Sequence, residues 1–329
     1  MYKQLTSEQR SQIFVLLQKK TERKAIARLV GCSQSTLSRE IRRNSTDKGN
    51  YLWDKAHARA MARRKRTTAN CAKDPAIVWE ALALLTDEDW SPEQISADMR
   101  KRGKNISHEL IYRHIRADRT GGLASHCRHK MKYNRHGRPG RTTKVKNIPD
   151  RVSIHQRPAE ADGSRFGDWE MDTIVGKDGK GAIVTLTERS TNMLLMERLP
   201  QGKHPEPLAK VVIRLLFPYR KTIRSITTDN GSEFCAHRLI SKALMPKGTK
   251  NPNLVFFADS YSSWQKGAIE NANKLIRQYI PKGSDFSSLS DAFIRKIQHK
   301  LNRRPRKKLN FDSPKKAFFR EIANFALAS

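Results

Sequence analysis

Apolar residues recur at three- and four-residue steps through the first third of the chain, and this period predicts short amphipathic helices. A first helix opens at Thr6, which forms a capping-box pattern with Gln9. A second ends at Gly31, because glycine readily leaves the helical conformation, and Ser33 then begins a third. Two short helices joined by a glycine turn predict a helix-turn-helix domain over residues 1–50.

The third of these helices turns Leu37 and Ile41 inward and leaves polar groups outside. Amide and guanidinium groups read base edges, and hydroxyl groups hold phosphates. The alternative is a plain three-helix bundle with a solvated face. We predict DNA binding by the outward residues Gln34, Ser35, Thr36, Ser38, Arg39, Arg42 and Arg43.

The pattern repeats further along the chain. Residues 51–73 predict a basic helix, which either follows a phosphate backbone or only connects domains. In residues 74–118, Ser91 and Gln94 again form a capping box, and a helix capped by Ser107 follows Gly103. We predict a second helix-turn-helix domain here, with a structural bundle as the alternative, and its DNA-facing residues would be His108, Tyr112, Arg113 and Arg116.

Residues 119–160 lose apolar periodicity, are basic and contain glycine and proline, so we predict a linker or arm. Strand patterns dominate from residue 161 to 329 and alternate with helical ones. Expected strands are Trp169–Val175, Ala182–Thr187, Met193–Leu199, a run at Ile226 and Leu254–Phe257, and expected helices start at Pro207 and span His237–Leu244 and the Glu270 region. Three strands with short connections, then alternating helix and strand, predict an α/β domain with a mixed five-stranded sheet.

Three acids in this half are candidates for chemistry. Asp172 interrupts an apolar strand, where a carboxylate is costly unless it is paired or binds a metal. Asp229 follows the Ile226 strand, although Asp229-Asn230-Gly231 is also a good hairpin turn. Glu270 lies beside the apolar stripe of a helix. The alternative to a catalytic role is a surface salt bridge to Lys274, four positions further along.

Phosphoryl transfer on DNA uses such a set of carboxylates. Two Mg²⁺ ions about 3.5–4 Å apart activate the attacking oxygen and stabilise the leaving one. Mg²⁺ prefers hard oxygen ligands and keeps several waters, so a few carboxylates suffice. Lys266, Lys274 and Arg277 would then hold substrate phosphates.

Charge supports a polyanionic partner. The 329 residues carry a net charge of +33, with 35 Lys and Arg against 16 Asp and Glu in residues 1–160 and 30 against 16 in the remainder. We expect no membrane partner, because no long apolar segment occurs, and a cytoplasmic protein, because no apolar signal region starts the chain. The four cysteines form no CxxC pair, which argues against structural zinc.

Several motifs resemble those of the insertion-sequence-30 family of DDE transposases, over nearly the whole chain. FGDWEMDTIVG at 166–176 resembles the family's first-Asp motif, and TTDNGSEF at 227–234 its second. The segment 261–286 resembles the third motif, and 301–318 the C-terminal signature.

This resemblance implies an RNase H-like core with Asp172, Asp229 and Glu270 as catalytic metal ligands. It implies two Mg²⁺ ions, for which Mn²⁺ would substitute, and double-stranded DNA partners: the terminal inverted repeats of a mobile element and a target. The enzyme would cut at the element's ends and join the freed 3′-hydroxyl to the target, as a homodimer or higher oligomer on DNA. A bacterial, nucleoid-associated location is also implied.

The chain departs from the family pattern in three places. Forty residues lie between Asp229 and Glu270, which is longer than usual, and we attribute the excess to a loop at 247–253. Ile269 and Lys274 replace the more common Asn and Gly. The role of Glu233 stays open between supporting the site and capping the next helix.

Two other functions stay open at this point. One is a DNA-binding regulator derived from a transposase, and the other is a DNA nuclease without a transfer step. The three intact acids favour transposition.

Overall fold

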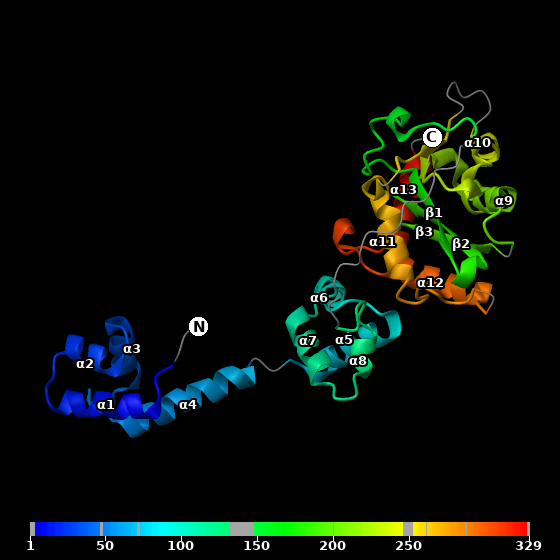
Figure 1. Ribbon diagram of the computed structural model, residues 1–329. Coiled ribbons are helices and arrows are strands. Elements are labelled where there is room, and N and C mark those ends of the chain that lie inside the picture. Colours follow the sequence, from blue (N-terminus) through cyan, green and yellow to red (C-terminus); the bar gives the residue numbers. More distant parts are fainter. Residues whose placement is uncertain are drawn as a thin grey trace. The chain divides into compact units, whose positions relative to one another are not determined.

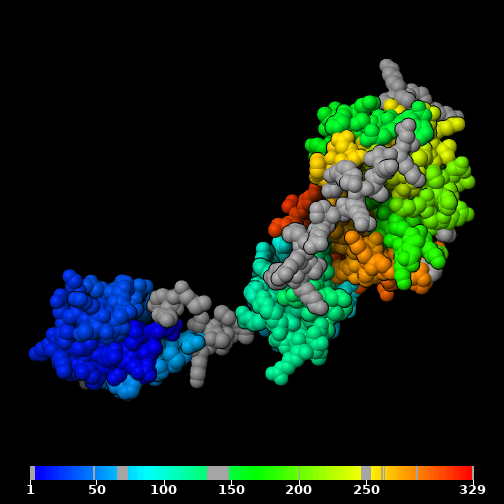
Figure 2. Space-filling model, in the orientation of Figure 1, coloured from blue at the N-terminus to red at the C-terminus, as the bar shows by residue number. Residues whose placement is uncertain are grey.

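The computed structural model describes residues 4–46, 49–70, 73–131, 148–199, 201–245, 253–260, 262–286 and 288–327. The chain divides into two compact units, Met1–Asp74 and Pro75–Ser329, whose ribbons are drawn in Figure 1 and surfaces in Figure 2. Among the described helices, none is both long and apolar enough to cross a membrane.

The first unit is a helical bundle of α1 (Ser7–Gln18), α2 (Arg23–Val30), α3 (Gln34–Asn44) and α4 (Trp53–Asn70). The predicted caps are present: Thr6 and Gln9 form the capping box, Gly31 adopts φ +71° after α2, and Ser33 caps α3. The basic helix predicted for residues 51–73 is α4, and its first turn packs into the bundle core through Ala56.

The second unit begins with four helices, α5 (Pro75–Glu88), α6 (Pro92–Lys101), α7 (His108–Ala117) and α8 (Gly122–Ser125). The capping box at Ser91 and the Ser107 cap occur as the sequence predicts. A separate apolar core, with Leu85, Ile95 and Ile111, holds these helices together. We refer to α5–α8 as the helical part of this unit and to the remainder, which contains the three acids predicted to be catalytic, as the catalytic part.

The catalytic part is built on one mixed sheet of five strands in the order β3-β2-β1-β4-β5. β1 pairs antiparallel with β2, and β2 with β3, whereas β1, β4 and β5 run parallel. The strands are β1 (Asp168–Val175), β2 (Ala182–Glu188), β3 (Leu194–Leu199), β4 (Ser225–Thr228) and β5 (Val255–Phe257). This arrangement confirms the predicted mixed five-stranded sheet and the RNase H-like class of the fold.

Helices cover both faces of the sheet (Figure 1). The α-helices are α9 (Pro205–Leu216), α10 (His237–Leu244), α11 (Gly267–Ile276), α12 (Asp291–Arg303) and α13 (Pro314–Leu327). Short 3₁₀ turns are η1 (Ile154–Gln156), η2 (Lys177–Gly179), η3 (Phe217–Thr222), η4 (Ser232–Phe234), η5 (Ser263–Lys266) and η6 (Lys307–Leu309). One apolar layer includes residues of α9, α10 and α13, and the other includes residues of α11 and α12.

The alternation of side chains along β1 decides where the candidate site lies. Trp169 and Met171 belong to the layer that includes α9 and α10, and Ile174 belongs to the α11 layer. Because successive side chains of a strand point to opposite faces, Glu170 and Asp172 share the face of Ile174. Both acids are therefore directed to the face covered by α11.

The catalytic part extends upstream of the predicted limit at residue 161. Ile148 is buried in the sheet's core, and the Val152 carbonyl accepts a hydrogen bond of 2.9 Å from the Phe257 amide. The predicted linker of residues 119–160 therefore differs from the structure at both ends, since α8 belongs to the helical part. Isolated apolar residues among polar ones gave no periodic signal there.

Candidate active site

Asp172 lies in the middle of β1 and is held by two donors. The Thr173 amide donates to its Oδ1 at 2.8 Å, and Asn273 Nδ2 of α11 donates to its Oδ2 at 2.8 Å. Its side chain is 22% exposed. Burial raises the pKa of this carboxyl, against the opposing effect of the nearby Lys266 ammonium.

Asp229 follows β4, which lies beside β1 in the sheet. Its Oδ1 accepts a hydrogen bond of 3.0 Å from the Gly231 amide, and Asn230 is anchored to the Ala258 carbonyl at 2.8 Å. Because β4 and β5 are parallel, this turn does not form a hairpin between them. The turn instead presents Asp229 at the carboxyl end of a central strand.

Lys266 brings the two aspartates to one point. Its Nζ lies 3.0 Å from Asp229 Oδ2 and 3.8 Å from Asp172 Oδ1, while its side chain is only 8% exposed. We predicted a phosphate-binding role for Lys266, and the structure gives it these two carboxylates as partners. The two acids thus flank a single cation.

Glu270 lies on α11 between Lys266 and Asn273, both of which contact Asp172. Residues three or four positions apart share a helix face, so Glu270 faces the same side as these two. It is half-buried and has no hydrogen bond or ion pair within the described ranges. Those ranges contain no group of three His, Cys, Asp or Glu side chains poised to hold a metal ion. The structure brings Asp172 and Asp229 together, and Glu270 makes no hydrogen bond or ion pair with either of them among the described residues.

A further acid, Glu170, was not among the predicted site residues. It is 1% exposed, and its Oε2 accepts a hydrogen bond of 2.8 Å from the Ile269 amide in the first turn of α11. Its Oε1 accepts from Arg189 Nε at 2.9 Å. Burial raises the pKa of Glu170, while the Ile269 amide and Arg189 oppose that rise. A carboxylate at a helix N-terminus is favourable, so Glu170 fixes α11 against β1. The signal in the sequence was a second acid two positions before Asp172, hence on the same strand face.

Glu233 also supports the site. It is 5% exposed, and its Oε1 accepts from Thr173 Oγ1 at 2.8 Å and from Lys203 Nζ at 2.7 Å. A Cβ at Gly231 would lie 2.6 Å from the Glu233 carboxylate, so a larger residue there would displace that carboxylate from its present position. Of the two roles left open by the sequence, the contacts fit support of the two aspartate-bearing segments.

The other predicted DNA-facing residues have different surroundings. On α3 all seven are exposed except the half-buried Thr36, and on α7 only Tyr112 is half-buried. Lys274 is exposed on α11. Arg277 instead donates to the Ile280 and Pro281 carbonyls beyond the end of its own helix, and burial lowers its pKa. The loop predicted at residues 247–253 lies, apart from Asn253, outside the described residues.

Comparisons with known proteins agree with this architecture. Residues 1–44 match a family model described as a helix-turn-helix domain. The chain is 39% identical to the transposase for insertion sequence element IS4351 of Bacteroides fragilis, over 98% of each chain. It is 36% identical to the transposase for IS1086 of Cupriavidus metallidurans, over 98% of this chain and 96% of that one.

The relatives include proteins named for the family itself. Transposase InsI for IS30A of Escherichia coli is 32% identical, over 97% of this chain and 84% of the relative. The solved catalytic core domain of BIV integrase is 18% identical over 49% of this chain and 98% of that chain, with a TM-score of 0.37, which is too low to support an argument. The similarity to the transposases runs through both units and the segments that carry the three acids. The chain therefore belongs to the insertion-sequence-30 family of transposases.

Proposed function

We propose that this protein binds the terminal inverted repeats of an insertion sequence, cuts the DNA there and joins the freed end to target DNA. Asp172, Asp229 and Glu270 would be the catalytic carboxylates of a DDE site and would hold two Mg²⁺ ions, with Mn²⁺ as a substitute. Full-length similarity to named transposases supports the reaction class.

The contact of Lys266 with both aspartates is the observation that carries this proposal. An ammonium nitrogen 3.0 Å from one carboxylate and 3.8 Å from the other marks a point where two acids favour a positive charge. Carboxylate oxygens are the donors that Mg²⁺ prefers, so the residues fit that ion. Bound ions would supply charge stabilisation at the attacking and leaving oxygens.

The residues of the chain position the reactants. Thr173 and Gly231 amides orient the two aspartates, and Glu170 fixes the helix that carries Glu270. Where cations neutralise the two carboxylates, the Lys266 ammonium would be free to hold a phosphate of the DNA. Such orientation of groups around the scissile phosphate supplies a large part of the rate in phosphoryl transfer.

Two displacements at phosphorus complete the reaction. In the first, a water oxygen bonds to phosphorus at the element's end, the bond to the 3′-oxygen breaks, and a 3′-hydroxyl is released. In the second, that 3′-hydroxyl oxygen bonds to a target phosphorus and displaces another 3′-oxygen as its hydroxyl. Each step makes one P–O bond and breaks one, and no covalent protein–DNA intermediate forms.

Helices α3 and α7 would read the repeats. Their exposed Arg, Gln, Ser and His groups suit base edges and phosphates. Pairing two ends requires at least two copies of the chain.

The test compares wild-type protein with Asp229→Asn on labelled DNA carrying the element's ends, with Mg²⁺ present. Wild type is expected to cleave and join, and the variant to bind without cleavage. Asp291→Asn is the matched control, because Asp291 is an exposed acid of the same domain whose carboxylate pairs with Arg198, and its substitution is expected to leave activity unchanged.

Other outcomes support the other two functions. Binding without any strand chemistry by wild type would indicate a regulator, and cleavage without joined products would indicate a nuclease. Equal activity of Asp229→Asn and wild type would contradict the assignment of the site.

A further inference from the structure

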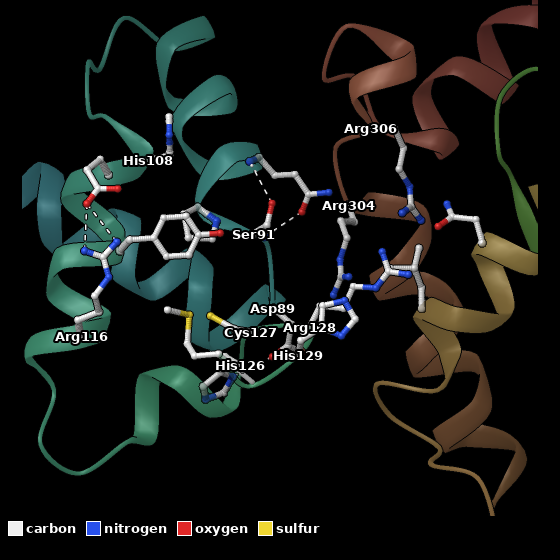
Figure 3. Close-up of a pocket in the computed structure, with 17 residues that line it drawn as sticks. Asp89, Ser91, His108, Arg116, His126, Cys127, Arg128, His129, Arg304 and Arg306 are labelled. Carbon is white, nitrogen blue, oxygen red and sulfur yellow. Dashed lines mark hydrogen bonds and ion pairs between the residues drawn. The ribbon is translucent and has the colours of Figure 1, made fainter. Parts of the chain in front are cut away.

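A cavity of about 720 Å³ lies between the helical and catalytic parts of the second unit (Figure 3). One wall comes from α7 and from the segment that follows α8. The other comes from α11 and from the segment after α12. The carboxylate site does not line it, although Asn271 of its wall directly follows Glu270. Its volume is in the range of ligand-binding pockets.

Specific contacts hold the two walls together. Asp89 accepts from Lys300 Nζ at 2.7 Å and from the Tyr279 hydroxyl at 3.1 Å. Gln278 Nε2 donates to the His126 carbonyl at 3.2 Å, and Gln94 Nε2 donates to the Pro305 carbonyl at 2.8 Å. Asp89 is 11% exposed, so solvent is largely excluded from this acid. Both the helical and the catalytic part contribute residues to the junction.

Three arginines converge on the cavity: Arg128 from the helical part and Arg304 and Arg306 from the catalytic part (Figure 3). Arg304 is 3% exposed, and its Nε is buried without a hydrogen-bond partner, as is the Nε of Arg306. Their terminal nitrogens are partly used, since Arg304 donates to Gln278 Oε1 and the Tyr279 hydroxyl, and Arg306 to the Leu301 carbonyl. A buried donor left without a partner is rare and costs about 1–3 kcal/mol. Arg128 is exposed, and within the described residues it makes no hydrogen bond or ion pair.

The three guanidinium groups also repel one another. Burial, and then the neighbouring Arg304, lower the pKa of Arg128. Burial together with Arg304 and Arg128 lowers the pKa of Arg306 to about 10. The acids of the cavity wall are used elsewhere: Asp89 pairs with Lys300 and His126, and Glu109 pairs with Arg116. The cluster thus lacks a protein counter-ion among the described residues.

We propose that this cavity binds a backbone phosphate of the DNA substrate through Arg128, Arg304 and Arg306. The unused guanidinium fork of Arg128 matches phosphate oxygens bidentately, and a phosphodiester would also give the Nε groups of Arg304 and Arg306 an acceptor while neutralising the cluster. The proposal rests on the proposed function, because it assigns the anion to substrate DNA.

The position of the cavity favours DNA over a free anion. Its walls include His108, Tyr112 and Arg116 of α7, the helix expected to contact DNA. They also include Asn271 and Leu275 of α11, the helix that carries Glu270. A strand that passes from the reading helix toward the carboxylates would cross the cavity, so a phosphate held there would set the distance between recognition and cleavage.

The test measures how DNA affinity depends on salt, with full-length protein, EDTA and a labelled duplex carrying the element's end. Each phosphate contact contributes about 0.9 to the slope of log K against log salt concentration. Arg128→Gln is expected to reduce the slope by about that amount and to weaken binding roughly tenfold. Arg303→Gln is the matched control, since Arg303 pairs with Glu88 at the same junction but does not line the cavity.

A second variant guards against loss of fold. Arg128→Lys keeps the charge but removes the fork, so we expect the wild-type slope with weaker binding. Equal slopes for Arg128→Gln, Arg303→Gln and wild type would overturn the proposal, as would equal reductions in both glutamine variants. Thermal protection by inorganic phosphate, lost in Arg128→Gln while its slope on DNA stays at the wild-type value, would assign the cavity to a free anion and also overturn it.

The two proposals fail differently. Absence of end cleavage by wild type in Mg²⁺ would contradict the proposed function but leave the slope difference between Arg128→Gln and Arg303→Gln in place. Equal slopes with normal cleavage would contradict only the phosphate site.

Discussion

The two regions predicted to be helix-turn-helix domains look alike in sequence, but each holds a largely buried acid in a different set of contacts. Glu40 of the first region accepts from Arg10 Nε at 2.7 Å and from the Tyr51 hydroxyl at 3.2 Å, all inside the first unit. Asp89 of the second accepts from Lys300 and Tyr279, which belong to the catalytic part. Glu40 therefore stabilises its own helical bundle, whereas Asp89 links its bundle to the catalytic part.

If both regions bind DNA as proposed, this difference gives them different tasks. The second region shares a compact unit with the carboxylate site, so DNA bound to α7 would lie at a set distance from that site. The first region forms a compact unit with its own core. Under the proposed function, we expect the first region to contribute mainly affinity for DNA and the second to place the scissile phosphate at the carboxylates.

The largest expected effect is a loss of stability when the contacts of Glu40 or Asp89 are broken. Glu40→Gln leaves the buried Arg10 without its charged partner, which costs about 3 kcal/mol, and Asp89→Asn does the same to the half-buried Lys300 at a somewhat lower cost. Asn is the better substitute at 89, because that residue has φ +54° and Asn tolerates this conformation. We expect Glu40→Gln to lower the unfolding temperature of the first unit only, and Asp89→Asn that of the second, in a calorimetric scan.

Asp291→Asn, an exposed acid of the catalytic part, serves as the control and should shift neither transition. If both buried-acid variants moved the same transition, the two regions would not be independent, and the comparison would fail.

Loss of one reading arginine is expected to have a smaller effect. Arg39→Ala and Arg113→Ala each remove an exposed cation from a helix predicted to contact DNA, and each should weaken binding of element ends by about 1–3 kcal/mol. Excess protein should restore cleavage by Arg39→Ala but not fully by Arg113→Ala, because only α7 shares a unit with the site. Cleavage rates at saturating protein make the distinction, and equal recovery of both variants would contradict it.

Acid should loosen the second region in a milder way. Burial would raise the pKa of Asp89, but hydrogen bonds from Lys300, His126 and Tyr279 outweigh it, and the pKa is lowered. A lowered folded pKa means that the stabilisation is present above the unfolded value, about 3.9, and is lost as pH falls below it. An acid-active protease should therefore cleave wild type faster below about pH 4 at the junction between α5–α8 and the catalytic part. Asp89→Asn should show no such increase in the cleavage rate.

Local signals in the sequence predicted the elements of the fold well. The capping residues Thr6, Ser33, Ser91 and Ser107 lie where the helices begin, because a cap involves only a few neighbouring residues. The alternating and apolar runs predicted all five strands for the same reason. Asp172 was conspicuous as an acid within an apolar run.

Contacts between distant residues were beyond local patterns. Glu170 meets the Ile269 amide across 99 positions, and Asp89 meets Lys300 across 211. The local sequence pattern does not distinguish Lys266 from a surface lysine. Only the fold shows that its ammonium lies between two aspartates. The assignment of Asp172, Asp229 and Glu270 as metal ligands stays a prediction.

Metal binding tests that assignment most directly. Mn²⁺ affinity is measured by titration calorimetry for wild type, Asp172→Asn, Glu270→Gln and the control Asp291→Asn, whose exposed carboxylate pairs with Arg198 away from the three acids. We expect both ligand variants to weaken Mn²⁺ binding at least tenfold and the control to stay near the wild-type value. Wild-type affinity in Glu270→Gln would remove the third acid from the site, and wild-type affinity in Asp172→Asn would contradict the account.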